Sequence, residues 1–249
     1  MKTKLSWLLG SISARCHLAV AAGILVALAS GCSSMPSLGR TSAKAAAFTP
    51  TNHTGDAKLP SGLRRVVVLP LAGGTVASPE SVSALDPVII SALQLQNRFE
   101  VVPLTREECQ RYFQTNEISS VSEIPANLMS VLQREYAADA VLFIDLTVYR
   151  AYHPLAVGLR AKLATIDSAH LVWTFDNVFS ADDPSVASSA VQYLKTRDQN
   201  GLPSDMIAVD LESPVRFATY ASAAMFATLP PVKAQVATAK EKRDGANER

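Results

Sequence analysis

Short apolar runs alternate with amphipathic segments through the middle of the chain, between about residues 63 and 229. Residues 65–70, Arg-Val-Val-Val-Leu-Pro, form an apolar run that ends at a proline, which is typical of a central strand covered on both faces. Residues 99–103, Phe-Glu-Val-Val-Pro, predict a second strand.

The segment between these two strands has helical periodicity. Its apolar positions recur at spacings of three and four, which predicts a helix over residues 79–96. These positions are Val82, Leu85, Ile89 and Leu93. Pro87 leaves two alternatives open. The helix starts late, with Asp86 as its N-cap and Pro87 in the first turn, or a longer helix is kinked at Pro87.

Two further helices follow the second strand. Residues 105–108, Thr-Arg-Glu-Glu, have the spacing of a capping box, which predicts a helix over residues 106–113. Pro125 opens the next helix, whose apolar positions share one face. These positions are Leu128, Val131, Leu132 and Tyr136.

The densest strand signal comes next. Residues 139–152 predict a long strand that turns at His153-Pro154. Residues 157–163 alternate apolar and polar side chains, as expected of a strand with one face in water, and residues 171–175 repeat the alternation. The three strands together predict an antiparallel meander.

Two more helices are predicted after the meander, from Asp183-Pro184 to Lys195 and from Ser213-Pro214 onward. The order of elements is therefore β-α-β-α-α-β-β-β-α-α. The predicted fold class is α/β (α+β), a mixed sheet of about five strands with an antiparallel meander and helices packed on it.

Residues 1–31 have the pattern of a secretory signal peptide. Lys2 and Lys4 supply a basic start, and residues 18–28 an apolar stretch that ends at small residues. This stretch is shorter than the roughly 20 residues that cross a bilayer, so a cleaved signal is favoured over a permanent transmembrane helix. Cleavage removes three basic residues and no acidic one, so the formal charge changes from +1 to −2. We expect no binding to nucleic acid.

Residues 28–32, Leu-Ala-Ser-Gly-Cys, resemble the bacterial lipobox, in which the cysteine receives diacylglycerol and a further acyl chain such as palmitate. We therefore predict lipidation of Cys32, because several acyl chains hold a protein stably in a membrane. An ordinary signal peptide with an incidental cysteine is the alternative. Ser33 after the cysteine is similar to proteobacterial lipoproteins of the outer membrane, which favours its periplasmic face over the inner membrane.

Segments without sustained periodicity flank the predicted domain. Residues 32–62 are rich in Ser, Thr, Ala, Pro and Gly and predict a flexible tether. Residues 230–249 begin with two prolines and continue mostly as Ala, Lys, Glu and Arg, which predicts a disordered tail. We therefore place one α/β domain at residues 63–229, a usual size for a single domain.

Reactive side chains form no recognisable motif, and we predict no catalytic, cofactor-binding or metal site. Gly73-Gly74 follows a strand, but both phosphate-loop patterns are absent, so a plain turn is favoured. Cys109 is left alone once Cys16 is cleaved off and Cys32 is lipidated. We expect it to be a small buried residue of a helix, and an intermolecular disulfide is the less favoured alternative.

Histidines and aspartates are the other candidates for chemistry. The histidines lie in the tether or at turns without a metal-site motif nearby, at His53, His153 and His170. Four aspartates could in principle supply paired carboxylates for hydrolysis: Asp139, Asp145, Asp167 and Asp176. Asp139 and Asp167 stand where strands start or turn, which explains them without catalysis.

The runs at residues 65–70, 99–103 and 138–146, with the hairpin at residues 166–173 ending in Val-Trp, resemble a known domain. It is the α/β domain of CsgG-type, LpoB-type and PelC-type lipoproteins and of the TolB N-terminal domain. The resemblance covers about residues 64–229. It implies non-enzymatic work in the cell envelope, namely export, activation of cell-wall synthases or envelope assembly. The long membrane-spanning hairpins of the curli pore are not evident, so a pore is disfavoured.

The preferred hypothesis is a lipid-anchored periplasmic binding and assembly module that is not an enzyme. Its expected partner is an envelope protein, and a homo-oligomer is left open. The partner is expected at a sheet edge or at the loop of residues 196–212, whose Met-Ile-Ala-Val run could equally pack against the domain. The alternative is an envelope hydrolase with an unrecognised acidic site that includes Asp145 and Asp176.

Overall fold

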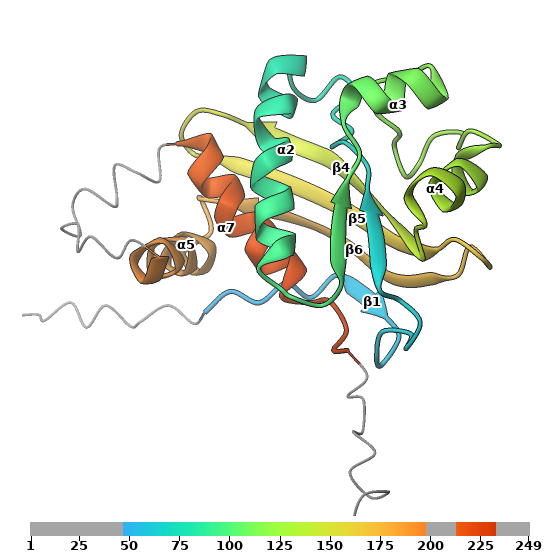
Figure 1. Cartoon of the computed structure of the whole chain (residues 1–249). Coiled ribbons are helices and arrows are strands. Elements are labelled where there is room, and N and C mark those ends of the chain that lie inside the picture. Colours follow the sequence, from blue (N-terminus) through green and yellow to red (C-terminus); the bar gives the residue numbers. More distant parts are fainter. Residues whose placement is uncertain (1–46, 198–212, 233–249) are drawn as a thin grey trace, which may run out of the picture. The chain divides into compact units, whose positions relative to one another are not determined.

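The computed structural model describes residues 47–197 and 213–232 (Figure 1). The chain divides into two units, Met1–Lys44 and Ala45–Arg249, and all described residues belong to the second. The predicted signal peptide, Cys32 and the Met-Ile-Ala-Val run of the 196–212 loop lie outside the described residues.

A six-stranded mixed sheet forms the centre of the domain, with the strand order β1-β6-β5-β4-β2-β3. The strands are β1 (His53–Gly55), β2 (Arg65–Val68), β3 (Glu100–Pro103), β4 (Ala140–Arg150), β5 (Ala156–Thr165) and β6 (Leu171–Ser180). Strand β2 is parallel to β3 and β4, and the other pairs are antiparallel. The predicted fold class and the meander β4-β5-β6 are confirmed. The sheet has one strand more than the five predicted.

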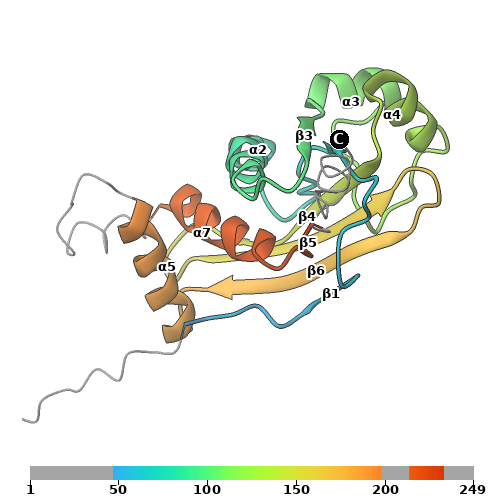
Figure 2. The ribbon, with the colours of Figure 1, turned by 60° about the horizontal axis from the view of Figure 1, so that its bottom comes forward.

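Helices cover both faces of the sheet beside β2. They are α2 (Pro79–Gln94), α3 (Arg106–Phe113), α4 (Leu128–Tyr136), α5 (Pro184–Arg197) and α7 (Pro214–Phe226). Helices α2 and α7 lie side by side (Figures 1 and 2) and share one apolar cluster with Val66 and Val68. Helices α3 and α4 share the other cluster with Val67 and Leu69. Successive residues of β2 thus enter opposite cores, and β2 is buried on both faces as predicted.

Helix α2 decides between the two alternatives left open by Pro87. It begins at Pro79, where the Ser78 hydroxyl accepts the Ser81 N–H, and it continues through Pro87 to Gln94. The longer helix is therefore the correct alternative. Asp86 is not an N-cap, and its carboxylate is free to bond elsewhere. The helix predicted over residues 106–113 is confirmed as α3, with both hydrogen bonds of its capping box.

The N-terminal boundary of the domain differs from the prediction. Residues 47–62 were assigned to a tether, but they contain β1, which pairs with β6 at the edge of the sheet. Upstream of β1, the Phe48 ring packs on Phe179 at 5.6 Å between centroids, and the Phe48 N–H donates to Ser189 Oγ at 2.8 Å. All three residues of β1 are exposed, so their side chains give no apolar periodicity from which a strand could be predicted.

The C-terminal boundary also extends beyond residue 229. Leu229 and Pro230 are buried, and the Pro231 carbonyl accepts the N–H of Leu59 at 2.9 Å. Val232 forms an isolated bridge with Leu59, which is 2% exposed. The described domain therefore spans residues 47–232, and its C-terminal end pairs with Leu59 in the segment after β1. No helix within the described ranges is long and apolar enough to cross a bilayer.

Candidate functional site

The three histidines considered in the sequence are spread over the described domain. His53 is exposed on β1, and His153 is exposed in the turn between β4 and β5. His170 pairs with Asp56, with 3.1 Å between Nε2 and Oδ2. Among residues 47–197 and 213–232, no three His, Cys, Asp or Glu side chains come together in a way that could hold a metal ion.

Each of the four aspartates is bonded to groups in its own surroundings. Asp139 accepts two main-chain N–H groups at the start of β2, and Asp167 accepts the N–H of the next residue in its turn. Asp145, 5% exposed, accepts both the N–H and the hydroxyl of Ser120. Asp176 pairs with Arg160 at 2.8 Å.

The pair Asp145 and Asp176, considered for hydrolysis, is separated by a strand. The two residues stand in register on β4 and β6, with Arg160 of β5 between them. Their backbones are therefore about 10 Å apart, since neighbouring strands are about 4.8 Å apart. Both carboxylates are already bonded to protein groups. Asp145 holds the Ser120 loop to β4, and the pair of Asp176 with Arg160 joins β6 to β5.

Cys109 is fully buried in α3 within the second apolar cluster, as expected. Burial raises the pKa of its thiol to about 11. The thiol therefore stays protonated at neutral pH and is suited to packing rather than to nucleophilic chemistry.

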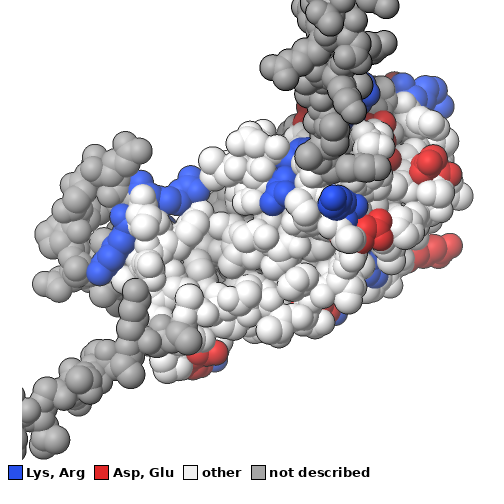
Figure 3. Space-filling model, turned by 90° about the horizontal axis from the view of Figure 1, so that it is seen from below, with Lys and Arg blue, Asp and Glu red and all other residues white. Residues whose placement is uncertain are grey.

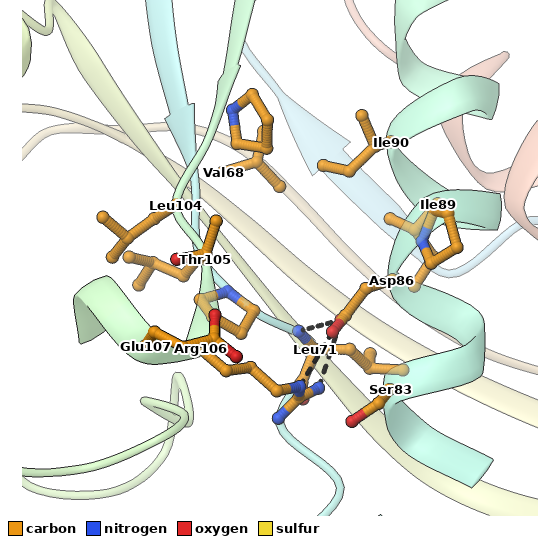
Figure 4. A pocket seen from close by; sticks show the side chains of 14 residues that line it. Val68, Leu71, Ser83, Asp86, Ile89, Ile90, Leu104, Thr105, Arg106 and Glu107 are labelled. Atoms are coloured by element: carbon orange, nitrogen blue, oxygen red, sulfur yellow. Dashed lines mark hydrogen bonds and ion pairs between the residues drawn. The ribbon is translucent and has the colours of Figure 1, made fainter. Parts of the chain in front are cut away.

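A hollow of about 470 Å³ lies at the carboxyl ends of β2 and β3 next to α2 (Figure 4), and we call it the α2–β3 groove. Its apolar lining includes four side chains that are at most 4% exposed, namely Val68, Leu71, Ile89 and Leu104. Ile90 and Pro87 of α2 form one side of the groove, and Pro103 of β3 lies on the other. In open sheets with parallel strands, ligands bind outside these carboxyl ends.

An ion pair closes one end of the groove. The Arg106 guanidinium binds Asp86 through two hydrogen bonds, Nε to Oδ2 at 2.8 Å and Nη2 to Oδ1 at 3.1 Å (Figure 4). Nη2 also donates to the Leu71 carbonyl at 2.8 Å, and the Leu71 N–H donates to Asp86 Oδ1 at 2.9 Å. These bonds join α2, α3 and the segment after β2, and they fix the groove in one shape.

Glu117 explains the Gly73-Gly74 turn. Its Oε1 accepts the N–H groups of Gly73 and Gly74 at 3.1 and 2.9 Å, and its Oε2 pairs with Arg106 at 3.2 Å. Main-chain N–H groups of this kind can cradle a phosphate, but here they already hold a carboxylate of the same chain. These bonds support the plain turn that the sequence favours at Gly73-Gly74 over a phosphate loop.

A second hollow of about 690 Å³ adjoins the groove and shares Ser83, Arg106 and Glu107 with it. The charged side chains that line the two hollows are Asp86, Glu107, Glu117 and Arg106. They sum to a formal charge of −2. Glu107 is exposed, and its carboxylate has no ion pair or hydrogen bond with any described residue. The site therefore combines an apolar floor with an acidic rim.

Sequence reasoning missed this site. Asp86 was considered only as a helix cap and Arg106 only as part of a capping box, and Glu117 was not considered. The available signal was topological. Residues that directly follow two parallel strands meet at one edge of the sheet, as Leu71 and Arg106 do.

Figure 3 shows where charged side chains lie on the lower face of the domain. On the face shown in Figure 3, Lys and Arg side chains are interspersed with Asp and Glu side chains, and a wide central area carries neither. The described residues visible on this face form no continuous basic surface of the kind that binds nucleic acid.

No family model and no curated protein matches the chain. Among solved structures, the PelC dodecamer from Paraburkholderia phytofirmans is 16% identical over 66% of this chain and 94% of that chain, with a TM-score of 0.36. Lipoprotein GNA1162 from Neisseria meningitidis is 16% identical over 58% and 100%, with a TM-score of 0.37. The LpoB C-terminal domain from Salmonella enterica is 14% identical over 48% and 84%, with a TM-score of 0.34. These low identities and TM-scores transfer no function to this chain.

Proposed function

We propose that this protein is a lipoprotein of the bacterial cell envelope, anchored through Cys32 at the periplasmic face of the outer membrane. Its domain of residues 47–232 binds an envelope protein and catalyses no reaction. The anchor rests on the signal-peptide pattern and on the small residues before Cys32. Acyl chains at this position would keep the domain at the membrane without a transmembrane helix.

The α2–β3 groove is the observation that carries the binding role. Its floor is apolar, and its charged side chains Asp86 and Arg106 are bonded to each other and to the main chain. A hollow with an apolar floor and bonded walls provides a preformed surface for a partner.

The described N-terminal boundary limits how far the domain can stand from the membrane. Cys32 and Phe48 are 16 positions apart. A fully extended chain covers at most about 3.3–3.6 Å per residue, so this segment reaches no more than about 55 Å. A partner would therefore have to present its binding segment within that distance of the bilayer, plus the width of the domain.

Mass spectrometry of the protein purified from bacterial membranes tests the anchor. The proposal expects an N-terminal peptide that begins at Cys32 and carries acyl mass, and a Cys32→Ala variant that loses both the lipid and the membrane fraction. Cleavage without lipid, or an uncleaved N-terminus, would contradict the anchor.

Cross-linking before solubilisation tests the binding role. The full chain should give one specific envelope-protein adduct that survives in the presence of excess unrelated lipoprotein. Deletion of residues 201–211 tests the competing docking surface proposed from sequence, because loss of the adduct in that variant alone would place the partner at the loop. A chain that forms no adduct and is monomeric would count against a binding module.

A further inference from the structure

We infer that the α2–β3 groove recognises a protein segment that places an aliphatic side chain on the groove floor and a Lys or Arg side chain against Glu107. This inference rests on the proposed binding function and names the chemistry of the partner. It makes Glu107 a specificity-determining residue.

The floor of the groove is apolar. Val68, Ile89 and Leu104 are at most 4% exposed, and together with the exposed Pro87 and Pro103 they line a hollow of about 470 Å³. Volumes of about 300–1,000 Å³ are typical of binding pockets that are lined by apolar groups. Water over such a floor gains few hydrogen bonds, so an aliphatic side chain that displaces it is favoured by the hydrophobic effect.

The rim of the groove carries the charged side chains. Arg106 already donates to Asp86, Glu117 and the Leu71 carbonyl, so its positive charge is paired within the chain. Glu107 remains exposed and unbonded among the described residues, and the rim as a whole carries a formal charge of −2. An acidic segment would be repelled there, whereas a basic side chain would find a carboxylate without having to break an existing pair.

The free edge of β3 disfavours a second copy that adds a strand to the sheet. Glu100 and Leu104 donate their N–H groups to Arg64 and Val68, so alternate residues of β3 face β2. The main-chain groups of Val101 and Pro103 therefore face away from the sheet, and Pro103 has no N–H to donate. Proline at an edge interrupts continuous strand pairing, so recognition at this groove must come from side chains.

A photo-cross-linking amino acid at position 90 tests the inference in the full chain in its bacterial host. Ile90 lies on the wall of the groove and is only partly buried. Tyr152, 85% exposed in the turn after β4, and Gln133, exposed on α4, carry the same cross-linker as controls for the rest of the surface. The expected adduct at position 90 joins a partner peptide that has an aliphatic side chain with a Lys or Arg within a few residues.

Charge reversal then tests the role of Glu107. Glu107→Lys should lower the yield of the position-90 adduct roughly fivefold to tenfold, because an exposed ion pair contributes up to about 1 kcal/mol and reversal adds repulsion. Glu123→Lys, an exposed glutamate outside both hollows, is the matched control and should leave the yield unchanged. Replacement of the partner's basic residue by Glu should restore the adduct with Glu107→Lys. Thermal unfolding of each variant separates lost binding from lost folding.

The outcomes distinguish this inference from the proposed function. An adduct at the control positions but not at position 90 would overturn the groove as the site while leaving a binding module in place. An adduct at position 90 that is unchanged by Glu107→Lys, or that joins an acidic segment or a second copy of this chain, would overturn the stated partner chemistry. No specific adduct at any position would contradict both.

Discussion

Replacement of Arg106 by methionine should destabilise the domain, because it leaves two carboxylates without their shared cation. Methionine replaces the apolar stem of the arginine side chain and lacks its guanidinium group. It removes the bidentate pair with Asp86, the pair with Glu117 and the hydrogen bond to the Leu71 carbonyl. The main-chain segment after β2 then loses one of its ties to α3.

The size of the effect follows from the exposure of the pair. Removal of one partner from a fully buried ion pair costs about 3–5 kcal/mol, whereas an exposed pair contributes about 0–1 kcal/mol. The side chains of Arg106 and Asp86 are 18% and 27% exposed, which places this pair between the two limits. We expect a loss of about 2 kcal/mol in the free energy of unfolding, or about 4–8 °C in Tm for a domain of this size.

Calorimetry and urea unfolding of the purified chain measure this loss, with Arg150→Met as the control. Arg150 pairs with Asp182 at 3.3 Å, and these side chains are 48% and 62% exposed, so its loss should lower Tm by no more than about 2–4 °C. The double variant Asp86→Asn with Arg106→Met should be no less stable than Arg106→Met alone, because one of the two unpaired carboxylates is gone. An Arg106→Met variant as stable as Arg150→Met would refute the reasoning.

Three further predictions concern the surroundings of the groove. Gly73→Ala should lower Tm by several degrees, because an added Cβ would lie 2.3 Å from Cγ2 of Val82, whereas Gly62→Ala, with nothing within 4 Å, should have little effect on calorimetric Tm. The Thr105 main-chain N–H donates to the Glu108 carboxylate and holds the pKa of Glu108 below its usual 4.5. The stabilisation from this bond is therefore present above that pH and is lost as the pH falls through the lowered pKa. Glu108→Gln should flatten the acid limb of a stability–pH curve, and an unchanged limb would contradict this. Cys109, with its raised pKa and full burial, should resist a thiol reagent at pH 8 in the folded Cys16→Ala, Cys32→Ala chain and react once urea unfolds it, as followed by absorbance.

Local sequence patterns were sufficient for most of the elements. The capping box at Thr105 and Glu108 predicted α3 with its observed bounds, because the bonds that start a helix join residues three positions apart. The period-two alternation through residues 157–163 predicted β5 and its pairing in the meander, because each strand shows one face to the core. In both cases the information lies within a few residues of the element itself.

Only the tertiary structure decided the edges of the domain and the candidate site. Strand β1 forms because it pairs through main-chain hydrogen bonds with β6, which lies more than 100 positions further along the chain. The side chains of β1 are exposed, so their sequence pattern gives no sign of this pairing. The groove exists because two parallel strands bring Leu71, Asp86 and Arg106 together from three separate elements. The sequence by itself determined most of the secondary structure and the mixed α/β class, since these depend on periodicity. Which polar side chains meet depends on strand order, and strand order is decided by the packing of the whole domain.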